Sequence, residues 1–308
     1  MEKKKNKVVD YLVYLAVRLV VAILQAVPYR LACSWAGGLA WLIYHIDKRH
    51  REVARENLRQ AFPGRWNEEQ LDRMVRRVLV HFCTLLIDII HIPRKLRICT
   101  YRRHAHLDTP RWVHWLFGGR PLLLVTAHYG NWELGGYVLG LLGYTTHAIA
   151  RPLDNEYLDD YLRRFRERTG QKILAKKGDF EQMTEILAKN GILATLGDQD
   201  AGQKGLFVDF FGRPASTHKA VAYLALEYNV PMIVLVVRKL PGELRYEIVI
   251  EDEILPEEYR DRPNAVREMT QRFTAALERL IRAAPEQYFW LHRRWKHQPP
   301  QRKAKKAA

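Results

Sequence analysis

Cysteine is scarce in this sequence, and the few cysteines lie far apart. The 308 residues include 3 cysteines, at positions 33, 83 and 99, and no Cys-x-x-Cys pair. Disulfide frameworks and thiolate zinc sites need paired or closely spaced cysteines, so both are disfavoured and a reducing compartment fits. The 12 histidines include no His-x-x-x-His pair that could hold a metal on one helix face. We therefore expect no metal centre and no bound cofactor.

The sequence also lacks a glycine-rich phosphate loop and an internal repeat, and its acidic residues are few relative to its basic ones. There are 34 Asp and Glu against 50 Lys and Arg, which leaves a net charge of +16. Such a charge implies an anionic partner, which could be nucleic acid, an anionic membrane surface or a phosphorylated substrate. The lysine-rich ends, including residues 299–308, are predicted to be solvated basic tails.

Residues 8–27 form a long apolar run in which Asp10, Arg18 and Gln25 are the strongly polar side chains. A helix of about 20 apolar residues is long enough to span a bilayer. An arginine near the centre of such a helix costs about 2.5–3.5 kcal/mol on insertion, so spanning and in-plane binding both stay open.

A second apolar segment, residues 31–46, carries aromatic side chains of the kind favoured at membrane interfaces, namely Trp35, Trp41 and Tyr44. We expect residues 1–47 to form membrane-associated helices. The alternative is a core-forming helical hairpin of a soluble domain.

Residues 48–298 are expected to form one domain with a helical part, 48–115, and an alternating part, 120–298. In the second part, apolar runs and helical patterns alternate. The predicted strands are 122–127, 145–150, 172–175, 192–197 and 231–238, with helices near 131–142, 154–169, 179–190 and 217–229. This alternation predicts an α/β fold with a mostly parallel central sheet flanked by helices. An antiparallel edge hairpin at 239–254 and a helix near 263–283 complete the expected order.

The segment from Leu122 to Gly136 carries the most specific chemical pattern. An apolar run ends at His128, and Glu133 follows five positions later, at the start of a predicted helix with Asn131 as its N-cap. In that arrangement the carboxylate can hold one imidazole nitrogen and leave the other free as a base. No serine or cysteine nucleophile stands beside the histidine, which points to direct attack by a substrate hydroxyl.

Two further polar side chains fall at predicted strand ends. Arg151 follows one strand and Asp198 follows another, and ligands of open α/β sheets gather at the carboxyl ends of strands. Asp198 and Asp200 supply too few carboxylate ligands for a clear magnesium site. Asp and Gly are also common in the turns that follow strands. Residues 214–217 are predicted to start a helix whose amide groups could meet a phosphate.

Four segments in this order resemble the bacterial lipid A biosynthesis (late lauroyl/myristoyl) acyltransferases, within the larger lysophospholipid and glycerolipid acyltransferase superfamily. The resemblance covers nearly the whole chain. Its segments are the His-x4-Glu pair at 128–133, Arg-Pro-Leu-Asp at 151–154, Gly-Asp-Gln-Asp at 197–200 with Phe-Phe-Gly-Arg-Pro-Ala-Ser-Thr at 210–217, and Trp-Leu-His-Arg-Arg-Trp-Lys at 290–296.

The resemblance implies an inner-membrane enzyme with its active site facing the cytoplasm. It would move a fatty acyl chain from a thioester, usually on acyl carrier protein, to a hydroxyl of a phosphorylated glycolipid acceptor. His128 would be the base and Glu133 its orienting carboxylate. Asn131 and Asp198 would shape the substrate pocket, and the candidate phosphate contacts are Arg151, Arg293 and Arg294. Acyl carrier proteins are acidic, which suits the +16 charge.

Two alternatives remain open at this stage. Mannoside-acylating and other glycolipid or lysophospholipid acyltransferases share this pattern, so the acceptor stays undecided. A basic, membrane-tethered nucleic-acid-binding protein would use the segment 292–296, with Arg and Lys on phosphates and Trp295 stacking on bases. That second alternative leaves the strand-end site unexplained, and we expect no nucleic-acid partner.

Overall fold

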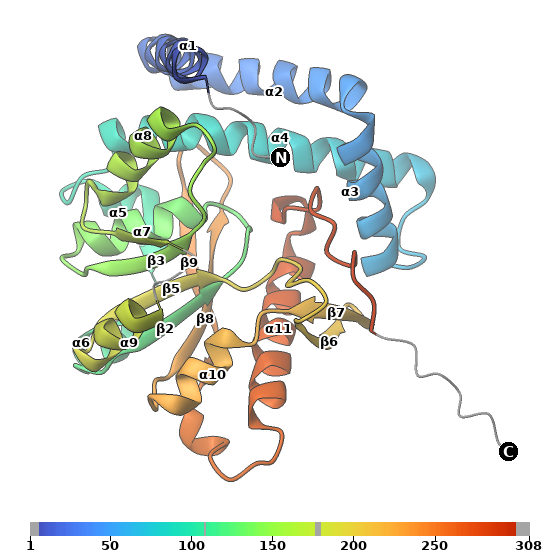
Figure 1. Ribbon diagram of the computed structural model, residues 1–308. Helices are drawn as coiled ribbons and strands as arrows, with labels where there is room; N and C mark the ends of the chain where they lie inside the picture. The colour runs from blue at the N-terminus through green and yellow to red at the C-terminus, as the bar shows by residue number, and fades with distance from the viewer. Residues whose placement is uncertain (1–5, 108, 176–179, 300–308) are drawn as a thin grey trace, which may run out of the picture.

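The computed structural model describes residues 6–107, 109–175 and 180–299 (Figure 1). The predicted basic ends, residues 1–5 and 300–308, lie outside these ranges. In the described part a seven-stranded sheet has the order β1-β9-β8-β2-β5-β3-β4. Its strands are β1 (Ala105–Leu107), β2 (Leu122–Thr126), β3 (Thr146–Ala150), β4 (Lys172–Ala175), β5 (Ile192–Leu196), β8 (Met232–Lys239) and β9 (Tyr246–Ile254).

All neighbouring strands run parallel except β8 and β9. The predicted α/β fold with a mostly parallel sheet is therefore confirmed. The β8–β9 hairpin is also present, but β9 is not an edge strand, because β1 pairs with it in parallel through Ala105 and Tyr246. The expectation of an edge hairpin was wrong because β1 precedes the alternating part of the sequence and is too short to give a strand pattern.

Helices cover both faces of the sheet (Figure 1). They are α7 (Trp132–Leu141), α8 (Glu156–Glu167), α9 (Phe180–Ala188), α10 (Ala220–Glu227) and α11 (Ala265–Ala283), with short 3-10 turns η1 (Pro256–Glu258) and η2 (Pro285–Gln287). Gly135 of α7 packs against Val237 on one face, whereas Phe273 of α11 lies near Val125 on the other. Strands β2 and β8, which are buried over most of their length, form the centre of the core between these layers.

A separate two-stranded hairpin, β6 (Leu206–Phe210) and β7 (Arg213–Thr217), corrects one prediction. The segment 214–217 starts no helix: it is a strand paired with β6, and α10 begins at Ala220. The turn between the strands has Phe211 and Gly212 at φ 57° and 73°. Two successive positive φ values make the tight turn that matches the twist of a hairpin, so Phe-Phe-Gly-Arg was a turn signal.

The amino-terminal half supplies a helical layer over the sheet. This layer contains α1 (Lys7–Ala26), α2 (Tyr29–Ile46), α3 (Lys48–Ala61) and α4 (Glu68–Lys95), and the chain then continues through α5 (Tyr101–His104) to α6 (Thr109–Phe117). Asn67 and Gln70 start α4 with a reciprocal capping box. Helix α2 buries a stripe of mostly small residues, Tyr29, Ala32, Ala36, Ala40 and Tyr44, and packs along α4.

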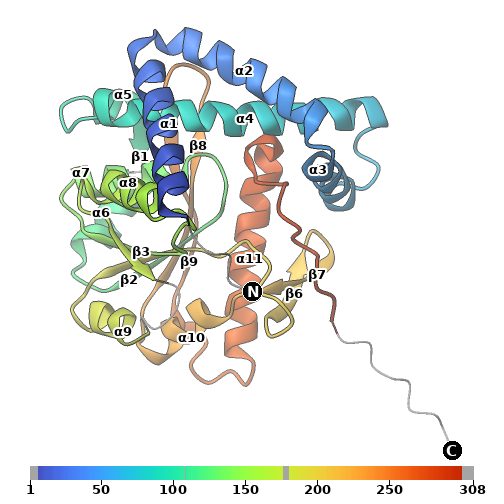
Figure 2. The ribbon, with the colours of Figure 1, turned by 45° about the horizontal axis from the view of Figure 1, so that its top comes forward.

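Helix α1 crosses over α4 and α8 and has no buried residue (Figure 2). Among the described helices it is the one long and apolar enough to cross a membrane by length and composition, with a mean hydropathy of 1.9. The two amino-terminal segments therefore differ. Helix α2 contributes one face to the core, as the soluble alternative expected, whereas α1 has no fully buried residue and packs only its partly buried Leu24 against the core.

Candidate active site

Two adjacent strands bring His128 and Asp198 together. Strands β2 and β5 pair in parallel with Thr126 opposite Leu196, and each functional residue stands two positions beyond its strand. The Asp198 carboxylate accepts hydrogen bonds from His128 Nδ1, at 2.9 Å, and from the His128 backbone N–H, at 3.1 Å. Both residues therefore lie at the carboxyl edge of the sheet, where the sequence analysis placed them.

The pair forms an oriented imidazole. With Nδ1–H donating to Asp198, the Nε2 lone pair is left free to accept a proton. Burial alone would lower the pKa of His128, but the charge and hydrogen bond of Asp198, with a smaller contribution from Glu133, raise it above its ordinary value. Burial opposes ionisation of Asp198, yet His128 lowers the pKa of that carboxyl below its usual range. Each partner thus stabilises the charged form of the other.

Glu133 occupies the predicted place in the first turn of α7 but has a different partner. Its two carboxylate oxygens accept hydrogen bonds from Nε and Nη2 of Arg166 on α8, at 2.9 and 2.5 Å. The expectation that Glu133 orients the histidine is therefore not what the structure shows, because Asp198 holds Nδ1. The Glu133 carboxylate, five residues after His128, is turned towards α8. The Asp198 carboxylate, which follows the neighbouring strand β5, faces the imidazole ring directly.

The loop that carries His128 is fixed by backbone contacts. Gly130 has φ 58°, and a Cβ at this position would lie 1.8 Å from the carbonyl oxygen of Val237. The Gly130 N–H donates to Gln287 O and the Asn131 N–H to Val237 O. These two amides are therefore engaged within the protein and are not free donors for a reaction oxyanion. The Asn131 side chain accepts from the Leu134 N–H, which confirms the predicted N-cap.

The carboxy-terminal segment closes one side of the site. The Phe289 N–H donates to the His128 carbonyl, and its ring lies 6.1 Å from the imidazole, while Trp132 lies 5.1 Å away on another side. The Gln199 side-chain amide donates a long hydrogen bond, 3.4 Å, to Nε2 of His128, the ring nitrogen that Asp198 does not hold. The sequence analysis assigned no role to these three residues, although Trp132 and Gln199 lie within motifs it had identified and Phe289 directly precedes one.

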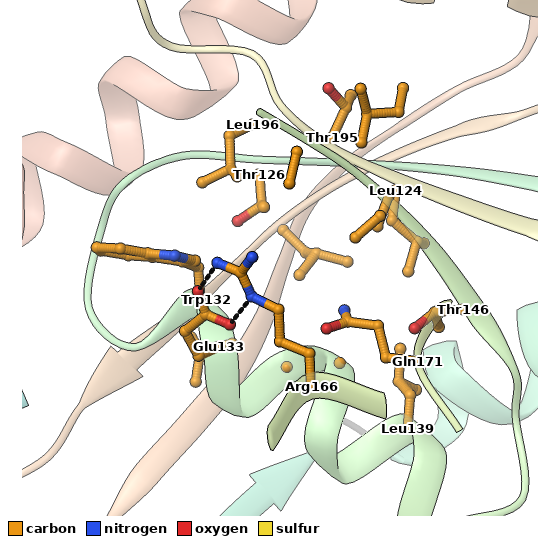
Figure 3. A pocket seen from close by; sticks show the side chains of 18 of the residues that line it. Leu124, Thr126, Trp132, Glu133, Leu139, Thr146, Arg166, Gln171, Thr195 and Leu196 are labelled. Carbon is orange, nitrogen blue, oxygen red and sulfur yellow. Dashed lines mark hydrogen bonds and ion pairs between the residues drawn. The ribbon is translucent and has the colours of Figure 1, made fainter. Parts of the chain in front are cut away.

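An apolar pocket opens beside these residues, between the sheet and helices α7 and α8 (Figure 3). Its volume is about 80 Å³, and Trp132 belongs both to its wall and to the surroundings of His128. The Glu133–Arg166 ion pair lies at one side of the pocket. Most of the wall is aliphatic, including Leu124, Leu139, Ile173, Leu196, Leu235 and Val237.

The three predicted phosphate-binding arginines occupy different environments. Arg151 follows β3 and is largely exposed beside Asp154, and Arg293 is also exposed. Arg294 is 2% exposed and donates to Ser216 O and to Thr217 Oγ1, so it holds β7 in place and cannot reach a phosphate at the surface. Trp295 is buried as well, which removes both residues from a nucleic-acid-binding surface.

Residues 2–297 match the model of a protein family described as bacterial lipid A biosynthesis acyltransferase. The chain belongs to the bacterial lipid A biosynthesis acyltransferase family. The resemblance inferred from the four sequence motifs is therefore confirmed, and the His128–Asp198 pair is the candidate active site of an acyltransferase.

Several relatives of this acyltransferase have assigned names. A lipid A biosynthesis lauroyltransferase of Escherichia coli (strain K12) is 27% identical over 284 residues, which cover 91% of this chain and 89% of the relative. A lipid A biosynthesis acyltransferase of Haemophilus influenzae is 24% identical over 270 residues, covering 87% and 83%. A phosphatidylinositol mannoside acyltransferase of Mycobacterium tuberculosis is 30% identical over 132 residues, covering 42% and 40%.

Proposed function

We propose that this protein transfers a fatty acyl chain from an acyl thioester to a hydroxyl of a phosphorylated glycolipid precursor of lipid A. The observation that carries the proposal is the His128 imidazole, held at Nδ1 by Asp198, with Nε2 directed away from that carboxylate. The relatives that align with most of this chain are named for lipid A biosynthesis, which supports this acceptor class.

The chemistry needs a base and no covalent enzyme intermediate. Nε2 of His128 removes the proton of the acceptor hydroxyl as that oxygen attacks the thioester carbonyl. The tetrahedral intermediate collapses by breaking the carbon–sulfur bond, and the proton passes from the imidazolium to the leaving thiolate. Asp198 holds the tautomer and stabilises the imidazolium, as the carboxylate does in hydrolase triads.

The apolar pocket gives the first part of the donor acyl chain a place to lie, since its volume of about 80 Å³ is smaller than that of a whole fatty chain. Its aliphatic wall begins at Trp132, beside the histidine, so a chain inserted there would leave its thioester carbonyl close to Nε2. An acidic acyl carrier protein is the donor we infer, because the net charge of +16 favours association with an acidic protein.

The acceptor would approach from the exposed side of the strand ends. Arg151 remains the candidate for its phosphate, since it is exposed at the end of β3 and shares a small recess with Arg163 and Arg166. Arg293 is a second exposed candidate near the carboxy terminus. A planar guanidinium binds phosphate oxygens through two parallel hydrogen bonds.

Helices α1 and α2 would hold the enzyme on the cytoplasmic face of the inner membrane. Their exposed side chains include large apolar residues, among them Leu12, Leu19, Trp35 and Trp41. Amphipathic and aromatic-rich helices of this kind bind at the boundary between headgroups and acyl chains.

The test is mass spectrometry of total lipids from cells that produce the wild-type chain or the His128→Ala variant. We expect one additional acyl chain on a phosphorylated glucosamine lipid with the wild type only. In vitro turnover should fall by 10²–10⁴, or about 3–5 kcal/mol, because the general base is lost. The matched control is His106→Ala, which removes an exposed histidine of β1 and should leave turnover unchanged.

The possible outcomes test the acyl-transfer chemistry and the identity of the acceptor separately. Near wild-type turnover of His128→Ala would remove the proposed base. Acylation of a mannoside or a lysophospholipid instead would keep the acyl transfer and replace the lipid A precursor as acceptor. No lipid difference between wild-type and variant cells would refute the proposed function.

A further inference from the structure

A second cavity lies under α1, away from the catalytic histidine. Its volume is about 250 Å³, and its lining residues belong to α1, α4 and α8, with Arg168 at the end of α8. None of the residues that line it lines the apolar pocket beside His128. Arg18, Arg164 and Arg168 provide its positive charge, and Asp160 is the acidic residue in its wall.

Helix α1 is docked on the protein along one side. Near its start, Asn155 Nδ2 donates to Asp10 O at 2.8 Å, and near its end Gln25 Nε2 donates to Ile90 O at 3.0 Å. Residues 10, 14, 17, 21, 24 and 25 are partly buried and share this side, as the helical period requires. The helix therefore lies along the body of the enzyme and keeps its opposite face free.

The opposite face of α1 is apolar. Its residues are spaced three or four apart and are between 44% and 69% exposed, and they comprise Val8, Leu12, Leu15, Leu19 and Ile23. A docked helix with one apolar exposed stripe suits in-plane membrane binding better than an independent span. The cavity beneath α1 would then lie at the level of the lipid headgroups.

Arg18 stands between the docked side and the apolar stripe. It donates to Tyr14 Oη at 2.7 Å, and its Cζ lies 5.0 Å from the ring centre of Tyr161 on α8. The guanidinium is thus drawn into the cavity and away from the apolar stripe. This placement explains how an otherwise apolar helix tolerates an arginine near its middle.

The cavity has an excess of positive charge. Asp160 is paired with Arg164 at 2.5 Å, and in the described part of the chain no carboxylate forms an ion pair with Arg18 or Arg168. Two guanidinium groups that form no ion pair within the described part of the chain, in a hollow beneath a helix with an apolar exposed stripe, provide charge complementary to a phosphate group.

We propose that this cavity binds the phosphate group of an anionic membrane lipid, with Arg18 and Arg168 as its cationic ligands. The proposal rests on the membrane association proposed above, but it is independent of acyl transfer. The lipid could be a membrane phospholipid or the phosphorylated acceptor itself, since both present the same group.

The experiment titrates full-length protein, kept in a nonionic detergent, with dihexanoyl phosphatidic acid in a calorimeter. We expect one site, and at least a tenfold loss of affinity in the Arg18→Gln/Arg168→Gln double variant, since hydrogen bonds to charged groups are lost. The matched control is Lys7→Gln/Arg30→Gln. It removes two positive charges outside the cavity, one on α1 and one on α2, and should bind as the wild type does.

Two additional measurements identify the source of the phosphate. An increased KM for the glycolipid acceptor in the cavity variant would assign the site to the acceptor, whereas an unchanged KM with lost lipid binding would assign it to a membrane phospholipid. Unchanged lipid affinity in the cavity variant, or an equal loss in the control, would overturn the proposal. So would inorganic phosphate binding as tightly as the lipid, because the site would then recognise a free anion.

Discussion

His128 depends on a carboxylate that is seventy positions away in the sequence. Asp198 holds Nδ1 at 2.9 Å and also accepts from the His128 backbone, so both the ring and its loop are fixed by one side chain. A buried Asp198 without its partner would face the cost of an uncompensated charge. The pair is therefore as much a structural unit as a chemical one.

The first prediction concerns the pH dependence of acyl transfer. A general base must be neutral, so kcat/KM falls as pH falls through the pKa of His128, which lies above its ordinary value. In Asp198→Asn the partner that raises this pKa is gone while burial still lowers it, so the acid limb should move to lower pH. The maximum of kcat/KM should also drop by about 10²–10⁴, because the tautomer is no longer held.

The comparison variant is Glu133→Gln. Glu133 makes only the smallest contribution to the raised pKa of His128, and its hydrogen bonds go to Arg166. The acid limb of kcat/KM in Glu133→Gln should therefore shift less than the acid limb in Asp198→Asn. A larger movement in Glu133→Gln would show that Glu133 orients the histidine during turnover, contrary to the contacts in this structure.

At the scale of elements, the turn between β2 and α7 is the tightest point of the site. Gly130 has a positive φ and faces the carbonyl of Val237 on β8, so strand, turn and helix meet without room for a side chain. This close approach places the amino end of α7 against the sheet. The positions of Trp132 and Glu133 at the pocket follow from it.

The second prediction tests whether position 130 needs glycine because of its positive φ or because of its contact with Val237. Gly130→Ala should destabilise the protein by about 4 kcal/mol or more, because a Cβ 1.8 Å from Val237 O forces the strand or the turn to move. Gly64→Ala is the matched control, since Gly64 has φ 72° and open space around its Cβ position. It should cost only about 1–2 kcal/mol of left-handed backbone strain.

The measurement is the free energy of unfolding of both variants by urea titration. Equal losses in the two variants would mean that positive φ, and not contact with β8, makes glycine necessary at position 130.

Across the whole molecule, a buried polar cluster joins the helical layer to the sheet. Asp88 of α4 accepts hydrogen bonds from Tyr29 of α2 and Tyr246 of β9 and forms an ion pair with Lys239 of β8. Asp88 is fully buried, so its charge is held entirely by these partners. Buried polar contacts therefore join the amino-terminal helices α2 and α4 to the strands β8 and β9.

The third prediction concerns the apolar surface of α1. Leu12 and Leu19 are 58% and 63% exposed, so transfer of both into the membrane should contribute about 2 kcal/mol. Leu12→Gln/Leu19→Gln should weaken binding to phospholipid vesicles roughly 30-fold in a sedimentation assay. The control is Phe117→Gln/Tyr223→Gln, which removes exposed aromatic residues of α6 and α10, away from α1 (Figure 1). Equal losses in the two double variants would refute a membrane role for α1.

The sequence by itself determined the α/β class, the strand-end placement of His128 and Asp198, the Asn131 cap and the family. These features follow from local patterns. Buried strands appear as apolar runs in the sequence, and a helix cap is made by residues that are neighbours in the chain. The order of the motifs can be compared with a family directly from the sequence. The hairpin turn at Phe211 and Gly212 was equally local, but it was not predicted, and residues 214–217 after it were read as a helix start.

Only the tertiary structure decided which carboxylate holds His128, where Arg294 points, and that Arg18 lies in a cavity. Each depends on contacts between distant segments. The register of β2 against β5 sets Asp198 beside the histidine, and packing of α7 against α8 draws Glu133 to Arg166. A sequence pattern gives the kind of side chain at a strand end, whereas strand register and helix packing decide which side chains meet.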